Sequence, residues 1–260
     1  MQVKRVARAD LDKTYCCISE VPESYGWVKS LPESRKWFET NLGKAVEGYH
    51  LLDGEKVVGL IYYAMSEKGL VSYEIEPNVA CIYCTELLRP YLHKGYGKLM
   101  FDHMKSDLKK QGVKGIIVTA SDFKEWMHYE LFLKQSFKTI IEHAPFKTMY
   151  FPLNKENIRV KVLSVNYTSS NDKVEVTLFK NFFCPVGAYM YHLIKKVAQG
   201  FGDEVKIVEI EATRETMQKY GTAEPLFNGK IKLFGPAKEE DVKKVIQEEI
   251  DNFKRQTQDA

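Results

Sequence analysis

The stretch from Glu86 to Met100 constrains the fold of this chain most, because an apolar strand pattern runs into a basic turn with two glycines that opens a helix. The first amides of a helix have no partner inside it, and the helix dipole places positive potential at the same end. Gly95 and Gly97 let the backbone approach a ligand without a Cβ in the way. The stretch therefore predicts a site for a pyrophosphate group. Further positive charge comes from His93, Lys94 and Lys98.

The Gly-x-Gly pattern at a helix start is only weakly specific. By itself it is equally typical of an ordinary tight turn between a strand and a helix. The missing third glycine at Gly-x-x-Gly spacing argues against a Rossmann-type dinucleotide site, and the glycine-to-lysine spacing argues against a P-loop. The order of the surrounding elements decides between these interpretations.

Hydrophobic periodicity and turn residues predict the order β-α-α-β-β-β-α-β-α-β-β over residues 1–153. Pro32 suits the first turn of a helix that ends before Gly43, and Asp53-Gly54 predicts a tight hairpin. Met100, Met104 and Leu108 mark one buried helix face. The predicted strands are Val3–Ala7, Tyr49–Leu52, Lys56–Met65, Val79–Leu88, Gly115–Ala120, Phe137–Glu142 and Phe146–Phe151. The predicted helices are Leu11–Ser19, Pro32–Leu42, Lys94–Gln111 and Phe123–Gln135.

This order and two motifs resemble the GNAT superfamily of N-acetyltransferases over about residues 1–153. The central motif of that family joins its fourth strand to its third helix, and here Leu87, Tyr91 and Gly95-Tyr96-Gly97 stand at matching positions. The later family motif, Tyr-x-x-x-Gly-Phe, is similar to the stretch from Phe132 to Phe137, and Met149-Tyr150-Phe151-Pro152-Leu153 looks like the family's closing strand. The resemblance implies an α/β acyl-CoA-binding fold with a mixed central sheet.

The same resemblance implies how acetyl-CoA binds. The cofactor would lie in an opening between the fourth and fifth strands, where backbone groups of Leu87 and Arg89 pair with the pantetheine arm. Amides from about Leu92 to Lys98 would hold the pyrophosphate, and Leu92 replaces the usual arginine or glutamine without affecting main-chain contacts. The predicted cofactor-binding residues are Leu87, Leu88, Arg89, Leu92, His93, Lys94, Gly95, Tyr96, Gly97, Lys98 and Phe132.

The residues that could transfer protons are marked less clearly in the sequence than the cofactor-binding turn. Phe132 stands where many family members have a tyrosine acid, and phenylalanine cannot donate a proton. Tyr129, three residues earlier on the predicted helix, is our candidate acid, and Glu76 and Cys81 are candidate bases. Each of these residues also has a purely structural interpretation, and CoA thiolate is a tolerable leaving group without an acid. The same region offers Glu74 and Tyr83 as further bases.

A second, smaller α/β unit is predicted over residues 172–260, after a connector over residues 154–171. Its predicted order is β-α-β-α-β-β-α, with a tight hairpin at Asn228-Gly229. The predicted strands are Val174–Phe179, Val205–Ile210, Pro225–Phe227 and Lys230–Phe234. The predicted core residues of its first and last helices are Met190, Leu193, Ile194, Val197, Val242, Val245, Ile246, Ile250 and Phe253.

Cys184 precedes the first helix of this unit, where the helix dipole favours a thiolate. This placement and the element order resemble the thioredoxin-like fold, with Ala223-Glu224-Pro225 similar to its cis-proline loop. An acetyltransferase followed by such a tail looks like the YoaP-like group of bacterial proteins. Gly187 replaces the second cysteine of Cys-x-x-Cys, which excludes a disulfide within the motif. A monothiol role and a structural role for Cys184 are both open.

Composition and charge argue against several other classes of protein. A net charge of +3 is too small for a nucleic-acid surface or a polybasic membrane surface, and no apolar run approaches the roughly 20 residues that cross a bilayer. The five cysteines have no disulfide spacing, and Cys81 and Cys84 would face opposite sides of a strand. We therefore expect a reduced, cytoplasmic protein with no metal site.

Three functional hypotheses follow from these patterns. The first is an N-acetyltransferase that moves the acetyl group of acetyl-CoA to the amine of a small molecule or peptide by direct attack. The second is a thiol-redox or thiol-binding protein that uses Cys184, and the third is a non-catalytic acyl-CoA sensor, suggested by Phe132. The acceptor pocket carries no motif, and a homodimer is compatible with the sequence.

Overall fold

A computed structural model describes residues 1–124, 126–169 and 173–258 of the chain. The chain folds into two compact units, and each unit combines three segments of the sequence. The predicted domain boundaries near residues 153 and 172 stay a prediction, because the second unit also takes segments from the first half of the chain. Unit 1 comprises Met1–Val21, Phe38–Val71 and Ile75–Lys161. Unit 2 comprises Pro22–Trp37, Ser72–Glu74 and Val162–Ala260.

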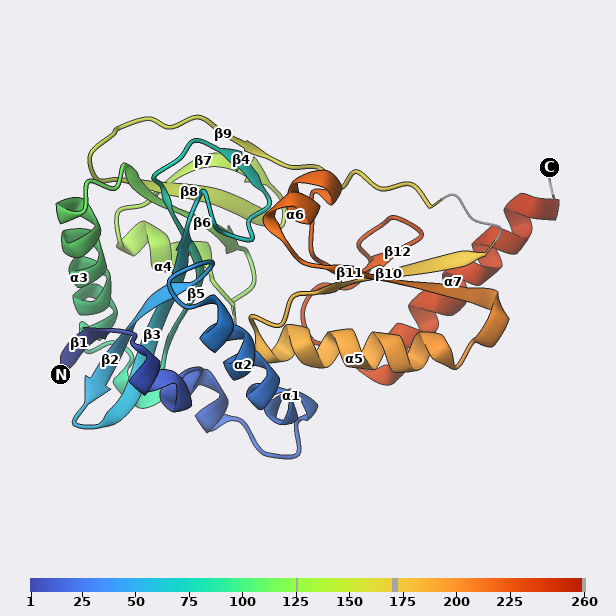
Figure 1. The fold of residues 1–260 in the computed structure, drawn as a ribbon, viewed down its shortest axis with the longest axis horizontal. Coiled ribbons are helices and arrows are strands. Elements are labelled where there is room, and N and C mark those ends of the chain that lie inside the picture. The colour runs from blue at the N-terminus through green and yellow to red at the C-terminus, as the bar shows by residue number, and fades with distance from the viewer. Residues whose placement is uncertain (125, 170–172, 259–260) are drawn as a thin grey trace. The chain divides into compact units, whose positions relative to one another are not determined.

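Seven strands of unit 1 form one sheet in the order β1-β2-β3-β5-β6-β8-β7 (Figure 1). β5 and β6 are parallel, and the other neighbouring pairs are antiparallel. The predicted α/β class with a mixed central sheet is therefore confirmed. The strands are β1 (Gln2–Arg5), β2 (Glu47–Asp53), β3 (Lys56–Met65), β5 (Ala80–Leu87), β6 (Gly115–Ser121), β7 (Lys138–His143) and β8 (Phe146–Pro152).

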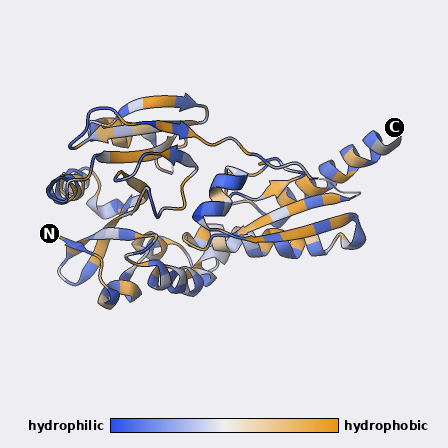
Figure 2. Cartoon of the chain, turned by 45° about the horizontal axis from the view of Figure 1, so that its top comes forward, coloured by the Kyte–Doolittle hydropathy of each residue, from blue (hydrophilic) through white to orange (hydrophobic). Residues whose placement is uncertain are grey.

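Different segments of the chain pack on the two faces of this sheet. On one face, α3 (Tyr96–Lys110) buries the predicted residues Met100, Met104 and Leu108. On the other face, Tyr62 of β3 packs against the rings of Tyr15 and Phe38. Strand residues are predominantly hydrophobic, whereas hydrophilic and hydrophobic residues alternate along a surface helix such as α7 (Figure 2). The core thus depends on apolar strands and on one apolar stripe per helix.

Two helix predictions in unit 1 were wrong in detail. Leu11–Ser19 is not one helix, because two 3-10 helices, η1 (Arg8–Lys13) and η2 (Cys16–Glu20), are separated there by Thr14 and by Tyr15 with a φ of 62°. The helix predicted over Phe123–Gln135 begins only at Tyr129, as α4 (Tyr129–Lys134). Before it, the Ser121 hydroxyl binds the backbone of Phe123 and Trp126, which stabilises a loop in competition with a helix.

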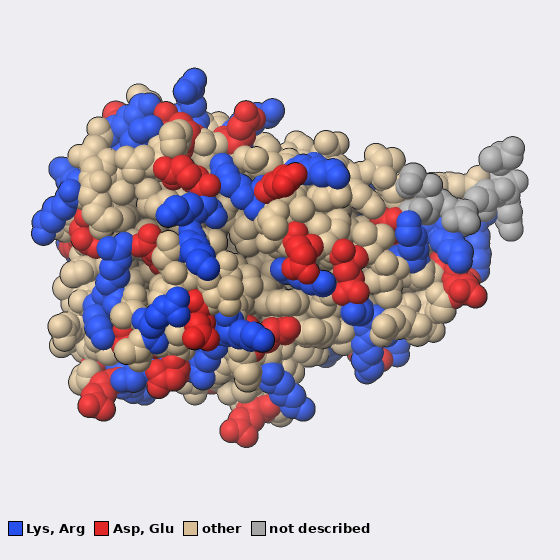
Figure 3. Space-filling model, viewed as in Figure 1, with Lys and Arg blue, Asp and Glu red and all other residues tan. Residues whose placement is uncertain are grey.

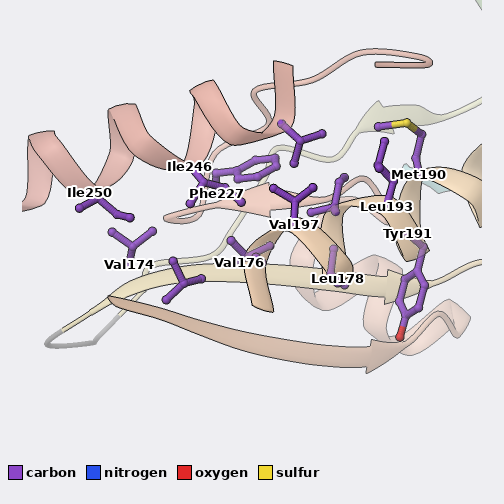
Figure 4. Close-up of a cluster of buried hydrophobic side chains, with 14 residues drawn as sticks. Val174, Val176, Leu178, Met190, Tyr191, Leu193, Val197, Phe227, Ile246 and Ile250 are labelled. Atoms are coloured by element: carbon purple, nitrogen blue, oxygen red, sulfur yellow. The ribbon is translucent and has the colours of Figure 1, made fainter. Parts of the chain in front are cut away.

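Unit 2 contains a three-stranded sheet in the order β11-β10-β12 (Figure 1). β10 is parallel to β11 and antiparallel to β12. The strands and helices are β10 (Val174–Lys180), α5 (Pro185–Gln199), β11 (Val205–Glu211), α6 (Arg214–Tyr220), β12 (Leu226–Phe227) and α7 (Glu239–Gln258). Its core joins β10, α5, α7 and Phe227 (Figure 4). The apolar positions predicted for the two helices line this core, with Val245 and Phe253 at its margin.

Several short elements complete the fold. In unit 2, α1 (Gly26–Lys29) and the start of α2 (Leu31–Asn41) pack near α5, where Trp27 contacts Tyr189 and Trp37 contacts Phe183. β4 (Tyr73–Ile75) and β9 (Val160–Val162) form a two-stranded sheet. The other 3-10 helices are η3 (Arg89–Tyr91) and η4 (Gly202–Glu204).

Two predictions for unit 2 were wrong. Lys230–Phe234 is not a strand, because pairing after the Asn228-Gly229 turn stops at the single bridge between Phe227 and Lys230. The chain then turns inward, where Leu233 packs on the core, and Phe234 stays 55% exposed. Among the described residues the cis peptide bond precedes Pro145, so Pro225 is not a cis-proline. The thioredoxin-like assignment itself stays a prediction.

Candidate active site

β5 and β6 pair over only part of their length, which opens a fork in the sheet. The parallel ladder joins Ala80, Cys81 and Ile82 to Ile116, Ile117 and Val118. Beyond it, β5 continues beside β3 as far as Leu87, whereas β6 continues beside β8 as far as Ser121. Each strand therefore follows its outer neighbour beyond the ladder. The residues of β5 past the ladder are half-buried, in contrast to its buried start.

A β-bulge at Tyr83 explains where the fork begins. Ile82 pairs with Tyr63 and Cys84 pairs with Tyr62, so Tyr83 is an extra residue on β5. A bulge bends its strand and ends regular pairing. Tyr83 is held in this position by a 2.6 Å hydrogen bond from the Leu70 amide to its hydroxyl. The bulge could not be predicted from the sequence, because no glycine or proline marks it.

The turn after β5 presents free backbone amides, as the glycine pattern predicted. Gly95 is the N-cap of α3 with a φ of 81°, and His93 has a φ of 60°. Within the described residues, the amides from His93 to Lys98 donate to no protein acceptor, whereas the Leu92 amide donates to Arg89 O at 3.2 Å. A Cβ at Gly95 or Gly97 would meet no atom within 4 Å. The turn is thus an open cradle for an anion.

The side chains around this cradle are mostly exposed. Arg89, Leu92, His93, Lys94 and Lys98 are exposed, and Leu88 is buried. The ring of Tyr96 contacts the ring of Tyr91, whose hydroxyl donates to Asp53 at 2.9 Å. The ammonium group of Lys98 pairs with Asp102 one turn along the helix. Because the cradle itself is main chain, this pair leaves its amides open.

The main chain on either side of Leu88 already has some partners. The Leu88 amide donates to Val58 O at 2.9 Å, and the Arg89 amide donates to a Glu20 carboxylate oxygen at 3.3 Å. The Leu87 amide donates at 3.3 Å to the carboxylate of its neighbour Glu86. A cofactor arm that pairs with Leu87 would replace only a side-chain contact, whereas one that pairs with Arg89 would displace Glu20.

Tyr129 and Phe132 lie in different surroundings on α4. Phe132 is fully buried, with its ring against Phe101 and Phe137. Tyr129 is half-buried at the first position of α4, and the Lys147 ammonium lies 4.9 Å from its ring centroid. Tyr129 lines an open hollow of about 770 Å³, beside the end of β6. The other residues lining this hollow are Asp122, Lys124, His128, Glu130 and Lys147.

Glu76 and Cys81 lie before or at the start of β5, at the opposite end of that strand from the cradle. The Glu76 carboxylate is buried, with both oxygens 2.9 Å from the Lys155 ammonium and with Lys114 at 3.6 Å. Its hydrogen bond from Lys155 lowers the pKa of this carboxyl group. Cys81 is buried within the paired start of β5, and Glu74 belongs to β4. These contacts support structural roles for Glu76 and Cys81.

Cys184 is the N-cap of α5, as the sequence indicated. The residue is exposed, yet desolvation by surrounding atoms raises the pKa of its thiol. Hydrogen bonds from the Gly187 and Val186 amides act in the opposite direction. Within the described residues, no group of three or more histidine, cysteine or acidic side chains is arranged to hold a metal ion.

Glu86 is a further candidate that sequence analysis missed. Its carboxylate is half-buried on β5 beyond the bulge, and burial raises its pKa. The only signal in the sequence is an acidic residue in an otherwise apolar strand pattern. That pattern does not tell which face of the strand a residue occupies when a bulge intervenes.

Comparisons with known proteins give similarity in structure only. No family model matches the chain, and no curated protein matches it. Solved structures similar to it include the ribosomal-protein-S18-alanine N-acetyltransferase of Escherichia coli, at 15% identity and a TM-score of 0.43 over 60% of this chain and 96% of that one. PaiA N-acetyltransferase of Thermoplasma acidophilum, in complex with coenzyme A, has 16% identity and a TM-score of 0.41 over 58% and 99%.

Arabidopsis thaliana NAA60, in complex with acetyl-CoA, is similar at 13% identity and a TM-score of 0.42 over 59% of this chain and 98% of that one. With TM-scores below 0.5, these similarities carry no conclusion about chemistry. The fork, the bulge and the free amides described above are properties of this chain itself.

Proposed function

We propose that this protein transfers the acetyl group of acetyl-CoA to the amine of an acceptor molecule. The observation that carries the proposal is that the amides from His93 to Lys98 have no acceptor in the described part of the chain. These amides follow β5, a strand whose open edge borders the fork. A diphosphate needs several convergent N–H donors, and an extended amide-containing arm needs a free strand edge. The fork and the cradle meet both requirements side by side.

The residues fit the parts of acetyl-CoA in order along the chain. The amides around Gly95 and Gly97 would hold the pyrophosphate, with Lys94 adding positive charge at the exposed rim. The Leu87 amide would pair with the pantetheine arm at the open edge of β5. The thioester then supplies an activated acyl carbon, and the acceptor amine attacks it directly. Positioning of the two reactants is the main contribution of the protein.

The mixed surface charge supports a small or peptidic acceptor over a nucleic acid. Lysine, arginine, aspartate and glutamate side chains are intermingled on the face that Figure 3 shows. No helix over residues 1–124, 126–169 and 173–258 is both long and apolar enough to cross a bilayer. The acceptor in this proposal is the amine of a small molecule or of a peptide.

Calorimetric titration of the purified chain with acetyl-CoA tests the cradle. Gly97→Glu should weaken binding roughly tenfold or more, a change of about 1.4 kcal/mol, because a carboxylate would oppose the pyrophosphate. Space around Gly97 is open, so the variant should fold. Ser106→Glu is the matched control, because it adds the same charge to an exposed position of α3, roughly 14 Å along the helix. Equal affinities for both variants would refute the assignment of the cradle.

A scan of amines for CoA release tests the transfer itself. Transfer to at least one alkylamine or peptide N-terminus is expected, and Cys184→Ser should leave that rate intact. Tight acetyl-CoA binding without CoA release from any amine would instead favour the acyl-CoA sensor. Loss of all activity in Cys184→Ser would favour the thiol hypothesis, for which the exposed N-cap position of Cys184 is the supporting observation.

A further inference from the structure

Glu86 occupies the face of the sheet opposite α3. Its neighbour Leu87 pairs with Gly59, and a Cβ on Gly59 would lie 2.9 Å from Met100 of α3 and 3.0 Å from Leu87. Leu87 therefore faces α3. Because successive strand residues point to opposite faces, Glu86 and its partner Leu60 point away from α3.

The Glu86 carboxylate also reaches the open edge of β5. The Leu88 amide donates to Val58 O on β3, so by alternation the Leu87 amide points to the opposite edge, which borders the fork. The Leu87 amide lies 3.3 Å from Glu86 Oε1. One carboxylate oxygen thus lies beside the main-chain group that would pair with the cofactor arm.

The charged and titratable groups around Glu86 come from two neighbouring elements. Glu20 and Cys16 of η2 lie close to it, and Arg89 of η3 follows it along the chain. Within the described residues, no lysine, arginine or histidine nitrogen lies within 4.0 Å of this carboxylate. Burial raises the pKa of Glu86, the charge of Glu20 adds to this effect, and the Leu87 amide and Arg89 oppose it.

We propose that Glu86 is the general base that takes a proton from the acceptor amine. The inference rests on the proposed acetyl transfer and goes beyond it by naming the group that makes a protonated amine nucleophilic. The position combines an open strand edge, the face opposite the cradle's helix and a carboxylate that, among the described residues, has no lysine, arginine or histidine nitrogen within 4.0 Å. A cationic amine is the partner that such a carboxylate attracts.

An acceptor R–NH₃⁺ gives one proton to the Glu86 carboxylate and becomes R–NH₂. Its nitrogen lone pair forms the new C–N bond at the thioester carbon, and the C–S bond breaks to release the CoA thiolate. The second proton of the nitrogen passes to the thiolate sulfur, and Glu86 returns its proton to water. The products are the acetylated amine, CoA thiol and one proton. A base with a raised pKa is better matched to this task near neutral pH than an ordinary glutamate.

Glu86→Gln tests the role, because glutamine keeps an oxygen that can accept the Leu87 N–H. Two probe nucleophiles separate chemistry from structure: propylamine is protonated at neutral pH, whereas methoxyamine is not. We expect kcat/KM for propylamine to fall roughly 10²-fold or more, with a much smaller loss for methoxyamine. In Glu86→Gln, the acid limb that Glu86 sets in the wild-type pH profile for propylamine should be replaced by a rise of the rate at higher pH that follows the ionisation of the amine itself. Glu55→Gln, at an exposed position of the β2–β3 turn, should match the wild type.

Three further measurements keep the inference distinct from the proposed function. Glu86→Gln should bind acetyl-CoA with wild-type affinity in calorimetry, whereas failure of the wild type to bind would sink the proposed function itself. Glu20→Gln should move the acid limb to lower pH, because it removes a like charge beside Glu86. Carboxyl ¹³C NMR of the acetyl-CoA complex should show one glutamate, absent in Glu86→Gln, that titrates above its ordinary range. Equal losses for both nucleophiles with an unchanged pH profile, or an ordinary Glu86 titration, would overturn the inference.

Discussion

At the scale of single residues, Phe132 shows how one position of a motif can have a packing role. Its ring lies edge-on to Phe101 and Phe137, and no part of it is exposed. A tyrosine hydroxyl would need a hydrogen-bond partner among these rings. The departure from the family motif therefore coincides with an aromatic core.

Phe132→Ala should lower the free energy of unfolding by roughly 3–5 kcal/mol, because it leaves a cavity among these rings. Leu133→Ala is the matched control on the next residue, which is 47% exposed, and it should cost little. Urea unfolding followed by circular dichroism measures both. A loss below about 1 kcal/mol for Phe132→Ala would show that its side chain is not part of the core.

His50 gives a residue-scale prediction about pH. It is 2% exposed, and its Nε2 lies 2.9 Å from the Tyr62 hydroxyl, which accepts a hydrogen bond from the Tyr15 amide. This contact is compatible with a neutral His50, because the Nε2 atom can accept from or donate to the hydroxyl according to its tautomer. Burial lowers the pKa of His50 to about 4.

Because the unfolded chain binds a proton at about pH 6.5 and the folded chain only at about pH 4, stability should fall as the pH falls between these values. Over the whole range, His50 should lower the free energy of unfolding by roughly 3 kcal/mol. Urea unfolding between pH 7 and pH 5 measures the slope, which should flatten in His50→Gln. Glu76, with its lowered pKa, loses its contribution only at lower pH, whereas Glu86, with its raised pKa, acts in the opposite direction. The difference in slope between the wild type and His50→Gln therefore isolates the contribution of His50. Identical slopes for the wild type and His50→Gln would contradict the attribution of this pH dependence to His50.

At the scale of elements, close approach decides where the short helix α1 packs. A Cβ on Gly26 would lie 2.1 Å from Cε2 of Tyr189, so the glycine lets α1 lie directly on that ring of α5. Trp27 contacts the same ring, and Glu33 of α2 accepts a 2.8 Å hydrogen bond from His192 of α5 when the Nε2 atom carries a proton. These contacts make the segment over residues 22–37 part of unit 2.

Gly26→Ala should lower the free energy of unfolding by roughly 1–3 kcal/mol, because the methyl group would force Tyr189 to move. Gly187→Ala is the matched control on α5. Its Cβ would have no neighbour closer than 3.8 Å, and alanine is favoured over glycine in a helix by up to about 1 kcal/mol. Thermal unfolding should therefore separate the variants in opposite directions. Equal Tm values for both would mean that the packing of α1 on Tyr189 does not contribute to stability.

At the scale of the whole molecule, the chain is interleaved between its two units. Unit 2 contains Pro22–Trp37 and Ser72–Glu74 as well as the residues from Val162 onward. A cut in the exposed stretch after Glu156 would therefore leave two pieces of the N-terminal fragment packed with the C-terminal one. Unit 2 therefore includes segments from both halves of the chain.

We predict that a protease site inserted between Glu156 and Asn157 yields two fragments that co-elute in size-exclusion chromatography. The contacts within unit 2 among α1, α2 and α5 should hold them together without a covalent link. Separation should require denaturant. Two separately eluting, folded fragments would show instead that the N-terminal segments dissociate readily from unit 2.

The sequence by itself determined the strands of the seven-stranded sheet, the amphipathic helices α3, α5 and α7 and the glycine turn, because periodicity and turn chemistry are local. Tertiary structure decided what local patterns cannot carry: the bulge at Tyr83, the late start of α4 and the missing strand after Lys230. It also decided the place of Glu86 at the fork and the membership of residues 22–37 in unit 2. These features depend on pairing and burial between segments far apart in the chain, where competing local preferences are overridden by packing.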